Sequence, residues 1–227
     1  MKYKAVIFDL DGTLIDSMGI WLQVDKEYLE KRNIPAPADL FQDVPEGNSY
    51  KEICVYFKEK FNLPDSIEEI GSEWTEMVER HYETDIALKT GARELIEYLH
   101  SQKIKMAIGT SNNKHLAETV LKSNDVLQFF DAIIAGCEDI KGKPYPDIFL
   151  KAAAEMQIDP AACLVIEDTL LGVMAAHNGD MDAFAIFDDN ETHDVEEMKK
   201  EADFYAEDFR EILHYLSEDQ IELSHVN

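Results

Sequence analysis

The sequence has few basic residues. It holds 21 Lys and Arg against 47 Asp and Glu, which gives a formal net charge of -26. Nucleic acids and anionic membranes bind cationic surfaces, so this balance argues against both as partners. A phosphorylated substrate remains compatible with it, because a bound divalent cation and one or two lysines attract a phosphate locally, while salt screens the remote acidic surface beyond about 8 Å.

Cysteine is scarce and histidine is scattered. The three cysteines, Cys54, Cys137 and Cys163, are far apart and form no Cys-x-x-Cys pair. We therefore expect reduced thiols, without a disulfide, redox or metal role. The seven histidines include no His-x-x-x-His or other metal-binding spacing, so they predict no histidine chemistry.

Long hydrophobic runs are missing as well. No apolar stretch reaches the roughly 18 residues of a membrane helix, and the chain enters its first apolar strand directly after Met1-Lys2-Tyr3-Lys4. We therefore expect no signal peptide and a cytoplasmic protein. With 227 residues, of which 45% are hydrophobic and 30% charged, the chain can bury one substantial core and a smaller second one.

Short β-rich runs alternate with amphipathic helical patterns, which predicts a parallel sheet with helices on both faces. Between the first two runs, residues 17–86 show helical periodicity and no convincing strand, so we expect a helical domain inserted into a core made of residues 1–16 and 87–227. The helices predicted for this insert are 18–32, 49–61 and 66–83. The predicted strands are 3–10, 105–110, 131–135, 163–167, 182–187 and 204–207.

Two carboxylates stand one residue apart after the first strand, in Phe8-Asp9-Leu10-Asp11-Gly12-Thr13-Leu14. Because side chains alternate along a strand, Asp9 and Asp11 point to the same side. At roughly 4 Å they repel by about 4 kcal/mol in an effective dielectric near 20, unless a cation or a shared proton relieves them. An Asx turn is the structural alternative. A nucleophile beside a proton-transfer group, with Gly12 allowing close approach of a ligand, explains the pair better.

Three further motifs lie at or beyond the ends of later strands. Thr110-Ser111-Asn112 supplies a hydroxyl and turn amides suited to a phosphoryl oxygen, with an ordinary helix N-cap as the alternative. Lys143 stands in Gly142-Lys143-Pro144, ahead of a helical pattern. Glu167 and Asp168 end a buried strand, and their oxygens suit a hard cation such as Mg²⁺, although Asp168 as a helix cap is the alternative.

In this order the four motifs resemble those of the haloacid dehalogenase-like (HAD) hydrolase superfamily, and the resemblance covers nearly the whole chain. It is closest to the branch with a helical cap after the first strand, which contains β-phosphoglucomutases and phosphoglycolate phosphatase-like enzymes. The resemblance implies a Rossmann-like α/β core, a mobile helical cap and Mg²⁺ as cofactor. It also implies phosphoryl transfer through an aspartyl phosphate.

The resemblance assigns roles to individual residues. It makes Asp9 the nucleophile, Asp11 the acid and base that serves first the leaving alcohol and then water, and Lys143 the cation that neutralises Asp9 and the phosphoryl group. It implies phosphate contacts from Thr110, Gly12, Ser111 and Asn112. It implies metal ligation by the Asp9 carboxylate, the Asp11 carbonyl and Asp168, with Glu167 binding directly or through water.

The insert departs from the β-phosphoglucomutase pattern at two positions. Trp21 stands where that pattern has a histidine that helps to hold the acid/base aspartate, and Tyr50 stands where it has an arginine that grips the distal phosphate. Both differences favour a phosphatase of small phosphorylated metabolites, with a sugar phosphate as the first expectation. Lys51 is a candidate for binding a second anion, so a phosphosugar mutase remains the alternative. By helical spacing, Trp21, Tyr28 and Leu29 are expected mainly in the core of the insert.

Two other enzyme or signalling classes are less consistent with the chain. A phosphoacceptor receiver domain also gathers acidic residues, a Thr and a Lys at strand ends, but in another order and without a large insert. Phosphonate hydrolysis needs a Schiff-base lysine in the insert, and none there stands in a recognisable motif. For assembly we expect a monomer or a dimer. The lysines that stay open for a Schiff base are Lys26, Lys31, Lys51, Lys58 and Lys60.

Overall fold

The computed structural model describes residues 2–37, 40, 50–136, 140–188 and 195–224. Within them, six parallel strands form one sheet in the order β3-β2-β1-β4-β5-β6, which confirms the predicted α/β core. The strands are β1 (Ala5–Phe8), β2 (Lys105–Thr110), β3 (Ala132–Ala135), β4 (Cys163–Glu167), β5 (Asp182–Ile186) and β6 (Phe204–Ala206).

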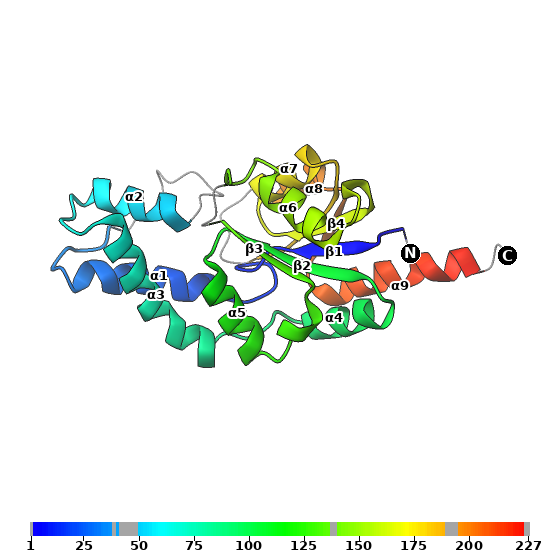
Figure 1. Cartoon of the computed structure of the whole chain (residues 1–227), viewed down its shortest axis with the longest axis horizontal. Helices are drawn as coiled ribbons and strands as arrows, with labels where there is room; N and C mark the ends of the chain where they lie inside the picture. The colour runs from blue at the N-terminus through cyan, green and yellow to red at the C-terminus, as the bar shows by residue number, and fades with distance from the viewer. Residues whose placement is uncertain (1, 38–39, 41–49, 137–139, 189–194, 225–227) are drawn as a thin grey trace.

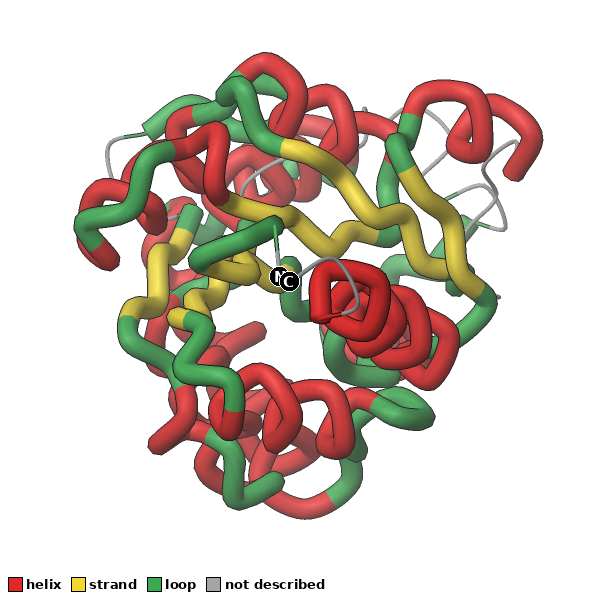
Figure 2. Tube along the Cα trace, turned by 90° about the vertical axis from the view of Figure 1, so that its right-hand side faces the viewer, coloured by secondary structure: helices red, strands yellow, loops and turns green. Residues whose placement is uncertain are grey.

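Helices cover both faces of the sheet (Figure 1). Because side chains alternate along β1, Val6 and Phe8 pack on one face and Ala5 and Ile7 on the other, and all four are fully buried. The first face is covered by α4 (Ala92–Ser101), α5 (Lys114–Ser123) and α9 (Phe209–Ser224). The second is covered by α6 (Asp147–Met156), α7 (Leu170–Asn178) and α8 (Val195–Glu201). Figure 2 shows the sheet between these layers, with α9 seen end-on.

The segment between β1 and α4 is helical and lies at one end of the molecule (Figure 1). Its core is aromatic: the Phe57 ring meets Trp74 edge to face at 4.7 Å between centroids, and Tyr28 meets Trp74 at 5.5 Å. A capping box between Ser66 and Glu69 starts its longest helix. The helices of this insert are α1 (Met18–Glu30), α2 (Tyr50–Lys60) and α3 (Ile67–Thr84).

Two neighbouring chain segments join the insert to the core. Ile15 and Leu88 form an antiparallel bridge, and the Asp16 N–H donates to the Ala87 carbonyl at 3.2 Å. The chain therefore leaves and re-enters the core side by side. The division into residues 17–86 and the remainder, and the mobility of the insert, stay predictions.

The elements predicted from sequence agree with the structure to within two residues at each end. The first strand shows the largest difference: it spans Ala5–Phe8 rather than 3–10 because the chain turns away from the sheet into the loop that carries Asp9 and Asp11. Helix α1 ends before residue 32, and Asn33 then adopts a left-handed φ of 56°. No helix in the described ranges combines the length and apolarity that crossing a membrane requires.

Candidate active site

The carboxyl ends of β1, β2 and β4 bring the predicted motifs to one edge of the sheet. Phe8 of β1 lies in register with Ile108 of β2 and Ile166 of β4. The loop after β1, the end of β2 and the end of β4 therefore meet. The strand order reverses between β1 and β4, and ligands in open α/β sheets bind at such a switch point.

Lys143 is the buried cation of the site. Its Nζ lies 2.6 Å from Asp9 Oδ1 and also donates to Glu167 Oε1. Although burial opposes the charge of Lys143, the two carboxylates hold its pKa above the ordinary value. Burial likewise raises the pKa of Asp9, and Lys143 opposes that shift. The ion pair with Lys143 therefore favours the ionised form of Asp9, and the role of Asp9 as nucleophile stays a prediction.

Glu167 is fixed by the start of α7. Its Oε2 accepts from the Asp168 N–H at 3.0 Å, the Thr169 N–H at 3.1 Å and the Thr169 hydroxyl at 3.0 Å. Gly172, in the first turn of α7, leaves the space for this carboxylate, because a Cβ there would lie 1.9 Å from Glu167 Cδ. Thr169 caps the helix through its hydroxyl. The helix-cap alternative for Asp168 is therefore wrong.

Three carboxylates form a compact oxygen donor set. One oxygen each of Asp9, Glu167 and Asp168 lie within 4.8 Å of one another, and all three residues are buried. Asp168 is also held by a hydrogen bond from the Thr13 hydroxyl. Hard carboxylate oxygens at this spacing fit Mg²⁺, which takes oxygen ligands at about 2.0–2.1 Å. The ligand roles of these residues and of the Asp11 carbonyl stay predictions.

The Asp11 carboxylate is held by donors from both the core and the insert. Its Oδ1 accepts from the Ser17 hydroxyl at 2.7 Å, from the Trp21 indole N–H at 3.0 Å and from the Tyr82 hydroxyl. Its Oδ2 accepts from the Asn112 amide at 2.9 Å. Four hydrogen-bond donors therefore point at its two oxygens. Three of them, Ser17, Trp21 on α1 and Tyr82 on α3, belong to residues 17–86, and Asn112 belongs to the core.

This arrangement matches a known family. Residues 6–186 correspond to the haloacid dehalogenase-like hydrolases. The chain belongs to this family. It is 30% identical to a phosphorylated carbohydrates phosphatase of Thermotoga maritima, over 76% of this chain and 80% of that protein. It is 29% identical to a β-phosphoglucomutase of Bacillus subtilis, over 81% and 83% of the two chains.

Solved structures share the fold of this HAD hydrolase. The crystal structure of CbbY from Rhodobacter sphaeroides in complex with phosphate superposes with a TM-score of 0.82, over 91% of this chain and 95% of that one, at 23% identity. The family match confirms the resemblance drawn from the four sequence motifs, and the chain is a hydrolase of this family.

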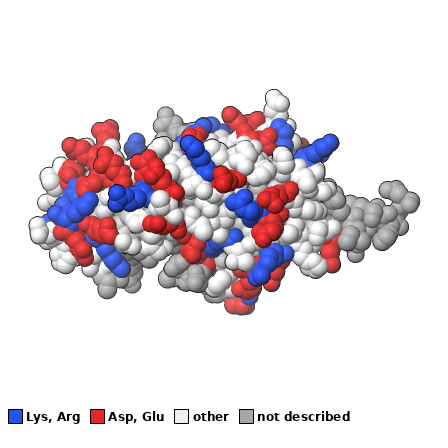
Figure 3. Space-filling view, turned by 90° about the horizontal axis from the view of Figure 1, so that it is seen from below, with Lys and Arg blue, Asp and Glu red and all other residues white. Residues whose placement is uncertain are grey.

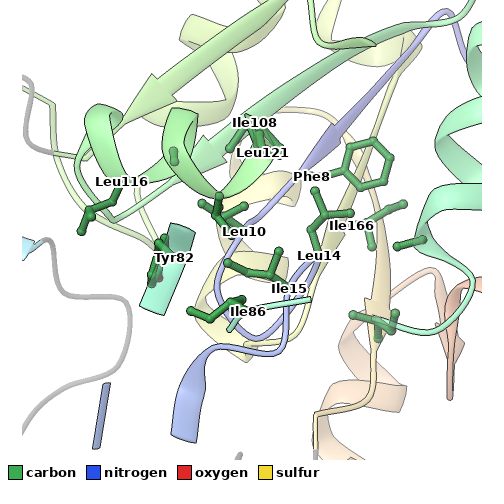
Figure 4. Packing of buried hydrophobic residues seen from close by; sticks show 14 of the residues in the cluster. Phe8, Leu10, Leu14, Ile15, Tyr82, Ile86, Ile108, Leu116, Leu121 and Ile166 are labelled. Carbon is green, nitrogen blue, oxygen red and sulfur yellow. The ribbon is translucent and has the colours of Figure 1, made fainter. Parts of the chain in front are cut away.

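Two residues of this HAD hydrolase have contacts that the sequence did not indicate. Tyr28 and Leu29 lie in the core of the insert as predicted. Trp21 is half-buried and packs against the same core, and its N–H also reaches Asp11 and, at 3.0 Å, the Tyr82 hydroxyl, which its spacing did not indicate. Tyr82 is fully buried near Leu10 (Figure 4), and burial raises its pKa well above the ordinary value, so it remains a donor.

The end of β2 is organised around the Thr110 hydroxyl. Thr110 is buried, and its Oγ1 accepts from the Asn112 N–H at 3.0 Å. The helix N-cap alternative is wrong for Thr110, because Asn113 caps α5 by accepting from the Leu116 N–H at 2.9 Å. The Asn112 amide donates to the Asp11 carboxylate, and Ser111 is half-buried. Phosphate binding by these residues stays a prediction.

The remaining candidates are placed unequally. Gly12 is buried with a φ of 80°, a conformation that glycine adopts without strain. Lys51 lies exposed on the first turn of α2, and nothing in the described part of the chain joins it to the other candidates. Cys54 and Cys163 are buried free thiols, as expected. Cys137 and the side chain of Tyr50 lie outside what the structure describes.

Proposed function

We propose that this HAD hydrolase is a Mg²⁺-dependent phosphatase of a small phosphorylated metabolite, with a sugar phosphate as the first substrate to test. The contact of Asp9 with Lys143, next to Glu167 and Asp168, carries the proposal. It brings the buried Asp9 carboxylate against a cation and within a cluster of three carboxylates, which supports Asp9 as the nucleophile and the cluster as a metal site. The similarity to a carbohydrate phosphatase supports it.

In the proposed reaction, Asp9 Oδ attacks phosphorus in line, and the bond from phosphorus to the substrate alcohol breaks. Asp11 gives its proton to that leaving oxygen. Asp11 then takes a proton from water, which attacks the aspartyl phosphate and frees Asp9 and inorganic phosphate. Lys143 offsets the charge of the phosphoryl oxygens, and the Thr110 hydroxyl and neighbouring amides bind them.

The proposed metal holders are Asp9, Asp168, the Asp11 carbonyl and Glu167, the last directly or through water. When bound, Mg²⁺ supplies charge neutralisation and a template for in-line attack. Asp11 must give up some of its four hydrogen bonds to reach the leaving oxygen. Because Trp21 and Tyr82 lie on the insert, movement of the insert is the proposed event that releases Asp11.

A phosphosugar mutase is the second candidate. The similarity to a β-phosphoglucomutase favours it, and Trp21 donates to Asp11 although the expected histidine is missing. The exposed position of Lys51 gives the mutase little support. The proposed partner in either case is the substrate alone, and a monomeric or dimeric state and a cytoplasmic location stay predictions.

The test is phosphate release with Mg²⁺ and with EDTA from sugar monophosphates, phosphoglycolate, nucleotides and phosphonoacetaldehyde, beside isomerisation of β-glucose 1-phosphate. Asp9→Asn is the blank. Metal-dependent release that Asp9→Asn lacks supports the phosphatase and ranks its substrates. Isomerisation without net release identifies a mutase, and release that persists in Asp9→Asn contradicts the proposed nucleophile.

A further inference from the structure

The insert contains a buried carboxyl group that the proposed reaction does not use. Asp25 lies on α1 and is only 4% exposed. It makes no hydrogen bond or ion pair with any residue that the structure describes. Its oxygens are not completely occluded, so a small part of their surface stays accessible. Buried carboxyl groups without partners are costly and uncommon. The group therefore requires a partner that the described part of the chain does not supply.

Asp25 lies on α1 between Trp21, which contacts Asp11, and Tyr28, which belongs to the aromatic core of the insert. It follows Trp21 by four residues, so both lie on one face of α1, about 6 Å apart along the helix axis. Trp21 reaches Asp11 Oδ1 at 3.0 Å. Three residues beyond Asp25, Tyr28 enters the aromatic core against Trp74. A ligand that extends from Asp11 along α1 would meet Asp25 before it meets this core.

The described surroundings of Asp25 contain no cation. Burial alone shifts its pKa, raising it to about 8, and no charged side chain of the described residues contributes. A titratable neighbour is the buried Cys54 thiol on α2, whose pKa burial raises to about 12. At neutral pH Asp25 is therefore mostly a carboxylic acid, with one donor and an acceptor. A second phosphate group there would be buried without compensation, whereas a hydroxyl would find both hydrogen-bond partners.

We propose that Asp25 binds a hydroxyl group on the alcohol part of the substrate and so makes the enzyme selective for polyhydroxy monophosphates over bisphosphates and plain alkyl phosphates. This inference rests on the proposed phosphatase function and deepens it, since it assigns the selectivity to a residue of the insert. Asp25 takes no part in bond making or breaking.

The test compares glucitol 6-phosphate with hexyl phosphate, which has the same chain length and no hydroxyls. Asp25→Leu should lower kcat/KM for glucitol 6-phosphate about 10- to 100-fold, the loss expected for a buried hydrogen bond, and change that for hexyl phosphate less than about 3-fold. It should also raise Tm, because an unpaired buried carboxyl is removed. Glu27→Leu, which removes an exposed carboxylate from the opposite face of α1, should change none of these.

If Asp25 were merely structural, Asp25→Leu would lower Tm and lower kcat/KM equally for both substrates. An equal loss of kcat/KM for both substrates, or no loss for either, overturns the proposal. A binding measurement separates failure of the Asp25 subsite from failure of the phosphatase function. Calorimetry compares the binding of glucitol 6-phosphate to Asp9→Asn with its binding to the double variant that also carries Asp25→Leu. If wild type releases no phosphate, the function fails. The subsite still stands if Asp25→Leu weakens that binding about 10-fold or more, and it falls if binding is absent or unchanged.

Discussion

Lys143 contacts two buried carboxylates, and methionine keeps its approximate size without its charge. We expect Lys143→Met to lose about 3 kcal/mol or more in unfolding free energy, because uncompensated charge stays buried. Phosphate release should fall more than about 100-fold. Urea unfolding measures the loss of stability, and a phosphate assay measures the loss of activity. Lys141→Met is the matched control, since Lys141 is exposed and its ammonium group lies over the Tyr145 ring. Equal behaviour of the two variants would contradict the role of Lys143.

Tyr82 and Tyr28 allow a matched test of the hydrogen bonds to Asp11. The Tyr82 hydroxyl donates to Asp11, whereas the buried Tyr28 hydroxyl has no hydrogen-bond partner among the described residues. We expect Tyr82→Phe to slow hydrolysis of an alkyl phosphate about 10-fold and that of p-nitrophenyl phosphate much less, because nitrophenolate leaves without a proton. Tyr28→Phe should leave both rates unchanged. Equal slowing of both substrates by Tyr82→Phe would argue against a role through Asp11.

The residues of the site differ in how far the sequence reveals them. Asp9, Asp11, Lys143 and Asp168 were identified because each stands in a short motif at or beyond the end of a predicted strand, where parallel strands converge. Tyr82 gave no such signal, since it lies 71 residues from Asp11 and its contact depends on how α3 packs against the loop after β1.

At the scale of elements, α7 starts so close to β4 that only glycine fits at position 172. Gly172→Ala would place its Cβ 1.9 Å from Glu167 Cδ, so Glu167 must leave Lys143 and Thr169. Alanine otherwise favours a helix by about 0.5–1 kcal/mol. We therefore expect a loss of stability and of Mg²⁺-dependent activity, measured by urea unfolding and by a Mg²⁺ titration of phosphate release.

Gly19→Ala is the control for that substitution. Gly19 lies in α1, and no atom lies within 4 Å of the position that a Cβ would take there, so alanine should add up to about 1 kcal/mol of stability without changing activity. If Gly172→Ala behaves like Gly19→Ala, the close packing of α7 against Glu167 does not support the site.

The elements themselves were largely predictable. Apolar runs of strand length and helical periodicity gave the bounds of the six strands and of the insert's three helices to within two residues, and the insert was recognised by its lack of strands. The placement of the insert over the core was not predictable from periodicity, because it depends on contacts between distant segments. The Trp21 indole shows this: its spacing predicts a core position, and its hydrogen bond to Asp11 appears only in the folded chain.

At the scale of the whole molecule, Asp25 makes stability depend on pH. Its pKa rises from 3.8 to about 8 on folding, so the folded state holds the proton more tightly. The stabilisation of the folded state by this protonated group is fully present below about pH 4, and it is lost as the pH rises through 8. Relative to Asp25→Asn, wild type should lose on the order of 4 kcal/mol of unfolding free energy over this window. Urea unfolding of both proteins from pH 4 to 8 measures it, and a constant difference would contradict it.

Charged side chains of both signs are mixed on one face of the molecule. On the face in Figure 3, acidic and basic side chains are interspersed over the insert and the core. With a net charge of -26, we expect phosphate attraction to depend on the buried Lys143 and a bound cation.

The most direct test of the central claim is to locate the phosphoryl group during turnover. Wild-type enzyme with Mg²⁺ and the best substrate of the panel is quenched in acid, digested and mapped by mass spectrometry. The account predicts a phosphoryl group on Asp9, absent in Asp9→Asn and absent when EDTA is present. Phosphate release without any label on Asp9, or a label on another residue, would contradict it.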